Sequence, residues 1–120
     1  MHTRRQVVNK PWGHEVIWAH TAQYVGKLLV INAGCKLSRQ YHEKKDESFY
    51  VLKGSMILEV GYPGDSDFDT MIMGVGNSFH CPPGTIHRMC AGTDGCEVAE
   101  VSTPESGAGD IVRLEDDYDR

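Results

Sequence analysis

The chain has 120 residues, a formal net charge of −5, 40% hydrophobic residues and 24% charged residues. These values are typical of one globular domain that buries a single core without disulfides or a structural metal. The acidic balance and the lack of a basic stripe argue against a nucleic-acid partner. No apolar run approaches the roughly 20 residues that span a bilayer, and the first 13 residues lack the apolar core of a signal peptide. We therefore expect a cytoplasmic protein with no membrane partner.

The hydrophobic residues occur in short runs rich in Val, Ile, Leu, Tyr and Phe, with no helical periodicity. Short β-type runs separated by glycines and prolines are typical of an all-β sandwich or barrel. The expected strands, in chain order, are residues 15–18, 24–32, 36–42, 48–52, 55–60, 70–73, 78–81, 87–90, 96–102 and 110–114.

Three segments between these runs predict breaks in the chain. Lys53-Gly54 predicts a tight hairpin turn, because glycine adopts positive φ readily. Residues 61–69, GYPGDSDFD, predict a polar surface loop, and Pro82-Pro83-Gly84 predicts a second sharp turn. We expect one domain over residues 1–120, with residues 1–10 as an N-terminal arm. Residues 115–120 are either a flexible tail or a docked extension of the last strand.

The four cysteines show no C-x-x-C pairing; they are Cys35, Cys81, Cys90 and Cys96. In a reducing compartment they are most simply free thiols packed as small hydrophobic side chains. A thiolate metal site is the alternative, for which Cys81 is the nearest in sequence to a histidine of interest.

Four metal-ligating side chains are concentrated in two glycine-framed stretches. Residues 34–54 contain Gln40, His42 and Glu47, and residues 76–87 end at His87. Side chains at i and i+2 of a strand share a face, so Gln40 and His42 can point into one interior. Two imidazoles, a carboxylate and an amide oxygen are enough to hold one divalent metal with an open position. His2, His14 and His20 have no comparable partners, and we expect no site role for them.

These stretches resemble the two motifs of the cupin superfamily. The first, G-x5-H-x-H-x(3,4)-E-x6-G, is matched by residues 34–54, with Gln40 in place of the first histidine. The second, G-x5-P-x4-H-x3-N, is matched by residues 76–91, with Ala91 in place of the asparagine. The resemblance implies a small antiparallel β-barrel, the double-stranded β-helix or jelly roll.

The Q-x-H departure is similar to the metal set of mannose-6-phosphate isomerases and of the stand-alone cupins related to the C-terminal domain of type II enzymes. The likeness extends to Lys10-Pro11-Trp12-Gly13, to residues 37–42 (L-S-x-Q-x-H), to residues 82–88 (P-x-G-x-x-H-R) and to Asp110-Ile111-Val112-Arg113. Two differences are Asp119, where that family usually has glycine before the last arginine, and His80, where it commonly has tyrosine. The full type II enzyme also carries a nucleotidyltransferase domain, which we do not expect in these 120 residues.

The resemblance implies a metal-dependent enzyme that interconverts an aldose and a ketose phosphate. It implies that Gln40, His42, Glu47 and His87 hold one divalent metal, zinc before manganese, iron, cobalt or nickel. The isomerase chemistry further requires cations for the phosphate and a base that moves a proton between C1 and C2. The candidates for phosphate binding are Arg88, Lys45 and Arg113, and those for the base are His80 and Glu43. An ordinary surface or core role explains each of these five residues equally well.

Two other functions remain open on the sequence. One is an Fe²⁺-dependent dioxygenase on the same barrel, against which Gln40 argues. The other is a binding module in which a metal only orients a sugar or carboxylate ligand, because one fold serves many functions. Family analogy also implies a homodimer, in which Val7-Val8 extends either the partner's sheet or that of its own chain.

Overall fold

The computed structural model describes residues 1–105 and 109–118. In these residues the chain forms nine strands and no helix, so no segment there is a helix able to cross a membrane. The strands are β1 (Gln6–Lys10), β2 (Gly13–His20), β3 (Val25–Ile31), β4 (Arg39–His42), β5 (Glu47–Gly61), β6 (Asp69–Gly74), β7 (Ser78–Cys81), β8 (Ile86–Ser102) and β9 (Ile111–Glu115).

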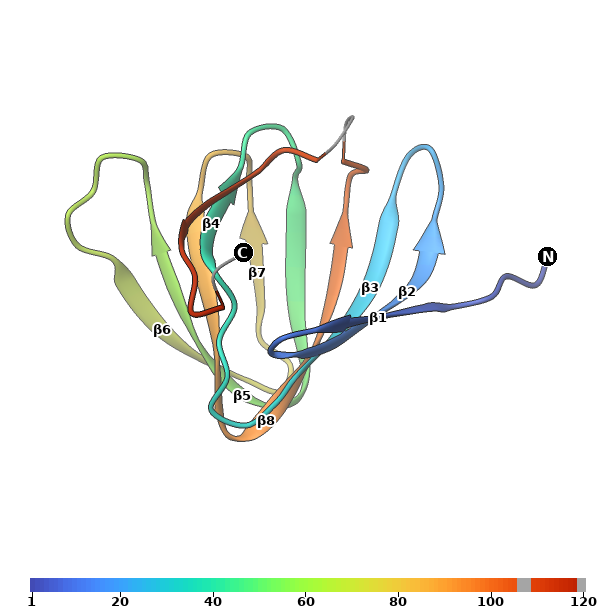
Figure 1. Cartoon of the computed structure of the whole chain (residues 1–120), viewed down its shortest axis with the longest axis horizontal. Helices are drawn as coiled ribbons and strands as arrows, with labels where there is room; N and C mark the ends of the chain where they lie inside the picture. Colours follow the sequence, from blue (N-terminus) through green and yellow to red (C-terminus); the bar gives the residue numbers. More distant parts are fainter. Residues whose placement is uncertain (106–108, 119–120) are drawn as a thin grey trace.

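All strand pairs are antiparallel, and the sheet curls into the open barrel seen in Figure 1. The long strands β5 and β8 run through both walls of this barrel. Residues 47–54 of β5 pair with residues 96–102 of β8, in a wall completed by β7, β3, β2 and β1. Residues 56–61 of β5 pair with residues 86–91 of β8, in a wall completed by β6, β4 and β9. The predicted all-β single-domain jelly roll is confirmed.

The predicted hairpin at Lys53-Gly54 is wrong. The strand continues through this point, and the register against β8 shifts on both sides of it. Gly54 has the expected positive φ of 74°, but Gly95 in β8 also has φ 74° and lies directly against it. Leu52 is an extra residue in β5 between Val51 and Lys53, and residues 92–95 of β8 oppose Ser55 alone, so both strands bend at this point and neither reverses. We expected separate strands at residues 87–90 and 96–102. For the same reason they form one bent strand, β8.

Alternation along the strands directs apolar side chains into the barrel. Phe49, Val51, Leu58 and Val98 are each at most 1% exposed, and Trp12 of the turn after β1 joins them in the core. The loop between β5 and β6 and the turn at residues 82–84 lie where they were predicted. Val7 and Val8 pair with β2 of the same chain. Residues 119–120, the end of the predicted tail, lie outside the described residues.

Candidate metal centre

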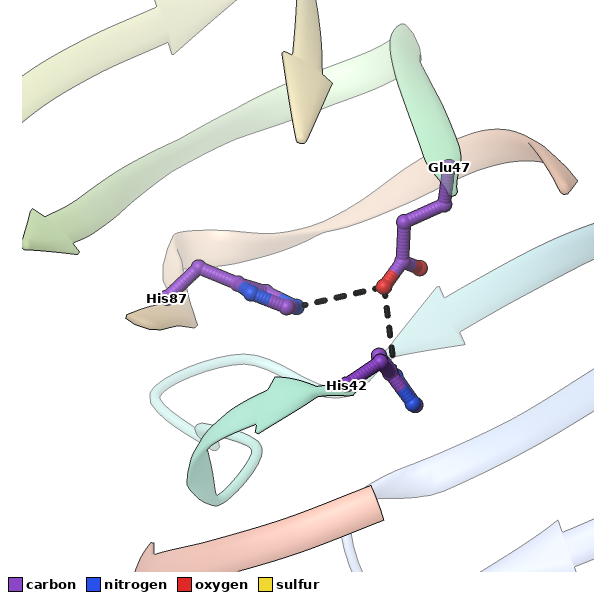
Figure 2. A group of neighbouring side chains, drawn as sticks. All are labelled: His42, Glu47 and His87. Atoms are coloured by element: carbon purple, nitrogen blue, oxygen red, sulfur yellow. Dashed lines mark ion pairs between the residues drawn. The ribbon is translucent and has the colours of Figure 1, made fainter. Parts of the chain in front are cut away.

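Three ligand-type side chains converge inside one end of the barrel. His42 ends β4, Glu47 begins β5 and His87 is the second residue of β8. Glu47 belongs to one wall, and both histidines belong to the other. All three are buried, and their nearest ligand atoms lie within 4.8 Å of one another. Figure 2 shows both imidazoles directed at the Glu47 carboxylate. Curling of the sheet therefore assembles a cluster of two histidines and one carboxylate that can hold a metal ion.

The hydrogen-bond partner of each Nδ1 atom determines whether the Nε2 atom of that ring faces Glu47 with a proton or with a lone pair. Nδ1 of His42 lies 3.0 Å from Oδ1 of Asp110, and Nδ1 of His87 lies 3.1 Å from the carbonyl oxygen of Thr85. A carboxylate and a carbonyl only accept hydrogen bonds, so each Nδ1 carries the proton. In the neutral rings each Nε2 then presents a lone pair. These atoms face Oε1 of Glu47 at 3.2 Å from His42 and 3.6 Å from His87.

Oε1 of Glu47 is buried and accepts no hydrogen bond from the described residues. Two imidazole lone pairs and a carboxylate oxygen around one point repel one another unless a cation lies between them. Burial also lowers the pKa of His87, which disfavours a proton as that cation. The donor set and the unsatisfied oxygen therefore fit a divalent metal ion.

Glu100 and Lys45 lie beside the cluster, and their pKa values and that of Glu47 depend on one another. Burial opposes ionisation of Glu47, but a hydrogen bond from Glu100 and the nearby charge of Lys45 hold its pKa well below the usual range. The pKa of Glu100 is raised well above its ordinary value by burial and by its hydrogen bond to Glu47, so Glu100 carries the proton of this pair. Burial lowers the pKa of Lys45, but the surrounding carboxylates outweigh it and raise that pKa, which keeps the ammonium charged.

Gln40 is placed beside the cluster by the strand pairing. It lies opposite His87 in the register of β4 and β8, two residues before His42. Its Oε1 accepts a hydrogen bond of 2.6 Å from the hydroxyl of Ser38. Gln40 and His42 line the same pocket, as expected for residues i and i+2 of one strand.

The cluster adjoins a pocket of about 290 Å³. Trp12, Leu29, Leu37 and Ile111 form its apolar walls. Its charged lining comprises the cations Lys10, Lys27, Lys45 and Arg113 and the acids Glu15, Glu100 and Glu105. A pocket of this size with many polar groups suits a small, hydrophilic and anionic molecule.

The structure brings some of the other predicted site residues to this pocket and not others. Lys45 and Arg113 line it. His80 is exposed and pairs with Asp46 at 2.6 Å, and Glu43 is exposed; neither lines the pocket. Arg88 is buried outside it, where its Nε donates to the carbonyl oxygen of Leu37 at 2.8 Å.

Two residues of the site had no assigned role in the sequence analysis. Glu100 shares the buried alternation of Cys96 and Val98 in β8, and a carboxylate on an interior face is a detectable signal. Asp110 lies 68 residues from His42 in sequence, and no local pattern could link the two. The four cysteines are free, as predicted, and Cys81 places its Sγ 3.2 Å from Nδ1 of His87. Burial raises the pKa of Cys81 to about 12, so it stays a thiol.

Comparison with known families assigns the fold: the Cupin domain family matches residues 27–102. This chain belongs to the cupin family. The matched region contains the three cluster residues and both long strands of the barrel. The cupin fold of the sequence analysis is therefore confirmed, and its finer likeness to mannose-6-phosphate isomerases remains a prediction.

Solved structures show the same cupin fold at low sequence identity. CapF from Staphylococcus aureus superposes with a TM-score of 0.82 at 15% identity, over 95% of this chain and 32% of CapF. Oxalate decarboxylase from Bacillus subtilis gives 0.77 at 16% identity, over 92% of this chain and 30% of the decarboxylase. KdgF from Halomonas sp. gives 0.68 at 24% identity, over 86% of this chain and 87% of KdgF. This cupin thus spans about a third of CapF and of the decarboxylase. No curated protein sequence matches it.

Proposed function

We propose that this cupin is a metal-dependent sugar-phosphate isomerase of the aldose–ketose type, similar to mannose-6-phosphate isomerases. The observation that carries the proposal is the shared pocket: His42 of the metal cluster and four cationic side chains line one cavity. An anionic sugar could place its hydroxyl groups at the metal and its phosphate at the cations.

In this proposal Gln40, His42, Glu47 and His87 hold the metal. Mixed nitrogen and oxygen donors suit zinc first and also manganese, iron, cobalt or nickel. A bound divalent metal would polarise the sugar carbonyl and stabilise the oxyanion that develops next to it. The residues themselves supply a rigid, buried donor set, because the hydrogen bonds at both Nδ1 atoms fix the orientation of the rings.

Arg113 and Lys45 are the cations that we assign to the phosphate. Lys10 and Lys27 both lie near Oε1 of Glu15, at 3.8 and 3.6 Å, so their charges are partly neutralised. Lys45 lies 3.6 Å from Oε1 of Glu105, at the pocket wall. The side chain of Arg113 has no hydrogen bond or ion pair within the described residues, which leaves its planar guanidinium available for a phosphate.

Glu100 is the residue that we assign to proton transfer between C1 and C2, in place of His80 and Glu43. It lines the pocket together with the charged Lys45, and it is hydrogen-bonded to the buried carboxylate of Glu47. A divalent metal held by Glu47 would favour the ionised form of Glu100, whose carboxylate could then take the proton from one carbon and return it to the other. His80 and Glu43 do not line the pocket.

The test is proton NMR of the zinc- or manganese-loaded protein with mannose 6-phosphate in D₂O. The proposal predicts ketose formation or deuterium incorporation at C2, and loss of both in His42→Ala and Glu100→Gln. Glu97→Gln, on the opposite face of β8, is the matched control and should retain both. Absence of exchange with a metal-loaded protein would reject isomerase chemistry with this sugar and favour a binding module that only orients a ligand.

A dioxygenase is the second candidate, because His42, Glu47 and His87 form a set of two histidines and one carboxylate. Oxygen consumption by the iron-loaded protein, in the presence of a sugar acid or another organic acid, would favour this alternative. We also expect a homodimer by analogy with the family, and light scattering of the purified protein tests it.

A further inference from the structure

We infer that Asp110 is a positioning residue of the metal centre, supplied by a C-terminal segment outside the matched cupin region. This segment, residues 109–118, contains β9 and follows the last matched residue, Ser102. The inference depends on metal binding by the cluster and not on the isomerase chemistry.

The carboxylate of Asp110 is buried against His42 and contacts it directly. Its Oδ1 accepts the hydrogen bond from Nδ1 of His42 at 3.0 Å, and its side chain is 8% exposed. This contact keeps the proton on Nδ1 and directs the lone pair of Nε2 at Glu47. Asp110 thus decides which ring nitrogen can bind a metal.

The second carboxylate oxygen of Asp110 holds the turn that joins two of the cluster residues. Oδ2 accepts hydrogen bonds from the backbone N–H groups of Lys44 at 2.6 Å and Lys45 at 2.9 Å. The backbone N–H of Glu43 also donates to the carbonyl oxygen of Asp110. This turn runs from His42 to Glu47. Asp110 therefore orients the ring of His42 and also fixes the backbone between His42 and Glu47.

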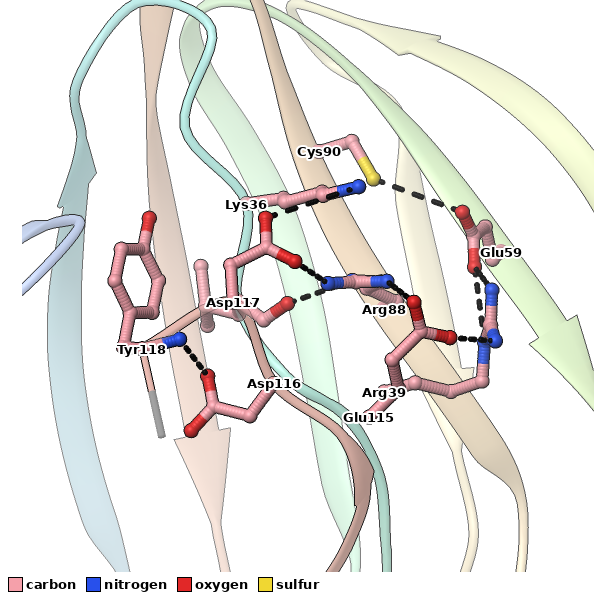
Figure 3. A network of polar contacts seen from close by, with 10 residues as sticks. Lys36, Arg39, Glu59, Arg88, Cys90, Glu115, Asp116, Asp117 and Tyr118 are labelled. Atoms are coloured by element: carbon pink, nitrogen blue, oxygen red, sulfur yellow. Dashed lines mark hydrogen bonds and ion pairs between the residues drawn. The ribbon is translucent and has the colours of Figure 1, made fainter. Parts of the chain in front are cut away.

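The C-terminal segment is itself fastened to the strand that contains the third ligand. β9 pairs with β4, with Ile111 opposite His42. Arg88 reaches Glu115 at the end of β9 and Asp117 beyond it, as Figure 3 shows, and Arg88 directly follows His87 in β8. The start of the segment is therefore held at His42, and its end is held at Arg88, next to His87. These contacts leave Asp110 little freedom to move.

Replacement of Asp110 by asparagine should reverse the tautomer of His42. The amide has one acceptor oxygen, and the N–H groups of Lys44 and Lys45 require it. The NH₂ group then faces Nδ1 of His42, which must accept, so the proton moves to Nε2. Protonated Nε2 cannot bind a metal, although the overall shape of the site is retained.

The test measures Zn²⁺ affinity of the full chain by competition with a chromogenic chelator, for the wild type, Asp110→Asn and Asp94→Asn. Asp94 is exposed in β8 and is the matched control for the same chemical change. We expect a 10- to 100-fold weaker affinity for Asp110→Asn, an altered visible spectrum of its Co²⁺ form, and wild-type values for Asp94→Asn. An affinity of folded Asp110→Asn within twofold of the wild type would overturn the inference.

A second measurement needs neither Asp110→Asn nor a metal. Long-range ¹H–¹⁵N NMR of the metal-free wild type reports the tautomer of each histidine, with His42 assigned through His42→Gln. A proton on Nδ1 of His42 supports the inference, and a proton on Nε2 overturns it. A wild type that binds Zn²⁺ and shows the Nδ1 tautomer, but promotes no proton exchange in the sugar, would reject the proposed function while leaving the role of Asp110 intact.

Discussion

Arg88 and Asp117 lie 29 residues apart in the sequence, and Nη2 of Arg88 donates a hydrogen bond of 3.0 Å to Oδ1 of Asp117. The Arg88 side chain is 1% exposed, whereas the Asp117 side chain is 42% exposed. Arg88 is therefore a buried cation whose charge is matched by carboxylates at the edge of the protein, and it joins the C-terminal segment to β8.

Arg88→Met should lower the free energy of unfolding by about 1–3 kcal/mol. The variant keeps the apolar length of the side chain but removes the hydrogen bonds to Leu37 and Asp117. The carboxylates left behind are accessible to water, so the loss stays below that of a fully buried pair. Urea denaturation measures it, with Arg5→Met at the exposed N-terminus as the control. Surface substitutions usually change the free energy of unfolding by less than about 0.5 kcal/mol. A change for Arg88→Met within that range would contradict the structural role of Arg88.

Gly54→Ala should be far more destabilising than Gly34→Ala. Both glycines have positive φ, 74° and 70°, so both substitutions incur the penalty of about 1–2 kcal/mol for a left-handed conformation. A Cβ on Gly54 would also lie 2.2 Å from the carbonyl oxygen of Gly95, whereas one on Gly34 meets nothing within 4 Å. We expect a loss of roughly 3 kcal/mol or more at Gly54, measured by urea denaturation. Equal effects at the two sites would disprove a tight contact between Gly54 and Gly95.

Zn²⁺ should stabilise the folded protein, because the three ligands converge only after folding. At a free metal concentration 100 times the dissociation constant, the expected gain is about 2.7 kcal/mol. Chemical denaturation with buffered Zn²⁺ and with a chelator measures this gain. His87→Ala should abolish it, and His14→Ala, outside the cluster, should retain it.

Glu100→Gln should stabilise the metal-free protein near neutral pH. Burial and Glu47 raise the pKa of Glu100 in the folded state, so the folded chain binds this proton more tightly than the unfolded chain does. The stability of the wild type then falls as pH rises from the ordinary value of 4.5 towards the raised pKa. The amide of glutamine can still donate a hydrogen bond to Glu47, and it has no proton whose retention becomes costly as pH rises.

Urea denaturation of chelator-treated protein at pH 4.5 and pH 7.5 tests the effect of Glu100. The advantage of Glu100→Gln over the wild type should be larger at pH 7.5 than at pH 4.5. Glu97→Gln, on the outward face of β8, should show no such dependence. A Glu100→Gln advantage that grows towards low pH would show that Glu100 is ionised in the folded state.

The sequence by itself determined the strands, their inward faces and the ligand types. Alternation put Glu47, Phe49 and Val51 on one face, and the spacing within each glycine-framed stretch indicated two halves of one site. These features are local, because side-chain direction in a strand repeats every two residues. Alternation also separates Arg88 from His87, so the exclusion of Arg88 from the pocket could have been predicted.

Only the tertiary structure decided which distant residues meet. Gly54 has positive φ, which is compatible with both a hairpin and a continuous, bent strand; pairing of β5 with β8 on both sides of Gly54, and the close approach of Gly95, decide for the bent strand. Asp110 becomes part of the site because β9 pairs with β4, an association between segments 68 residues apart at His42. Such contacts arise from strand pairing and burial over the whole chain, and the local sequence around each residue does not specify them.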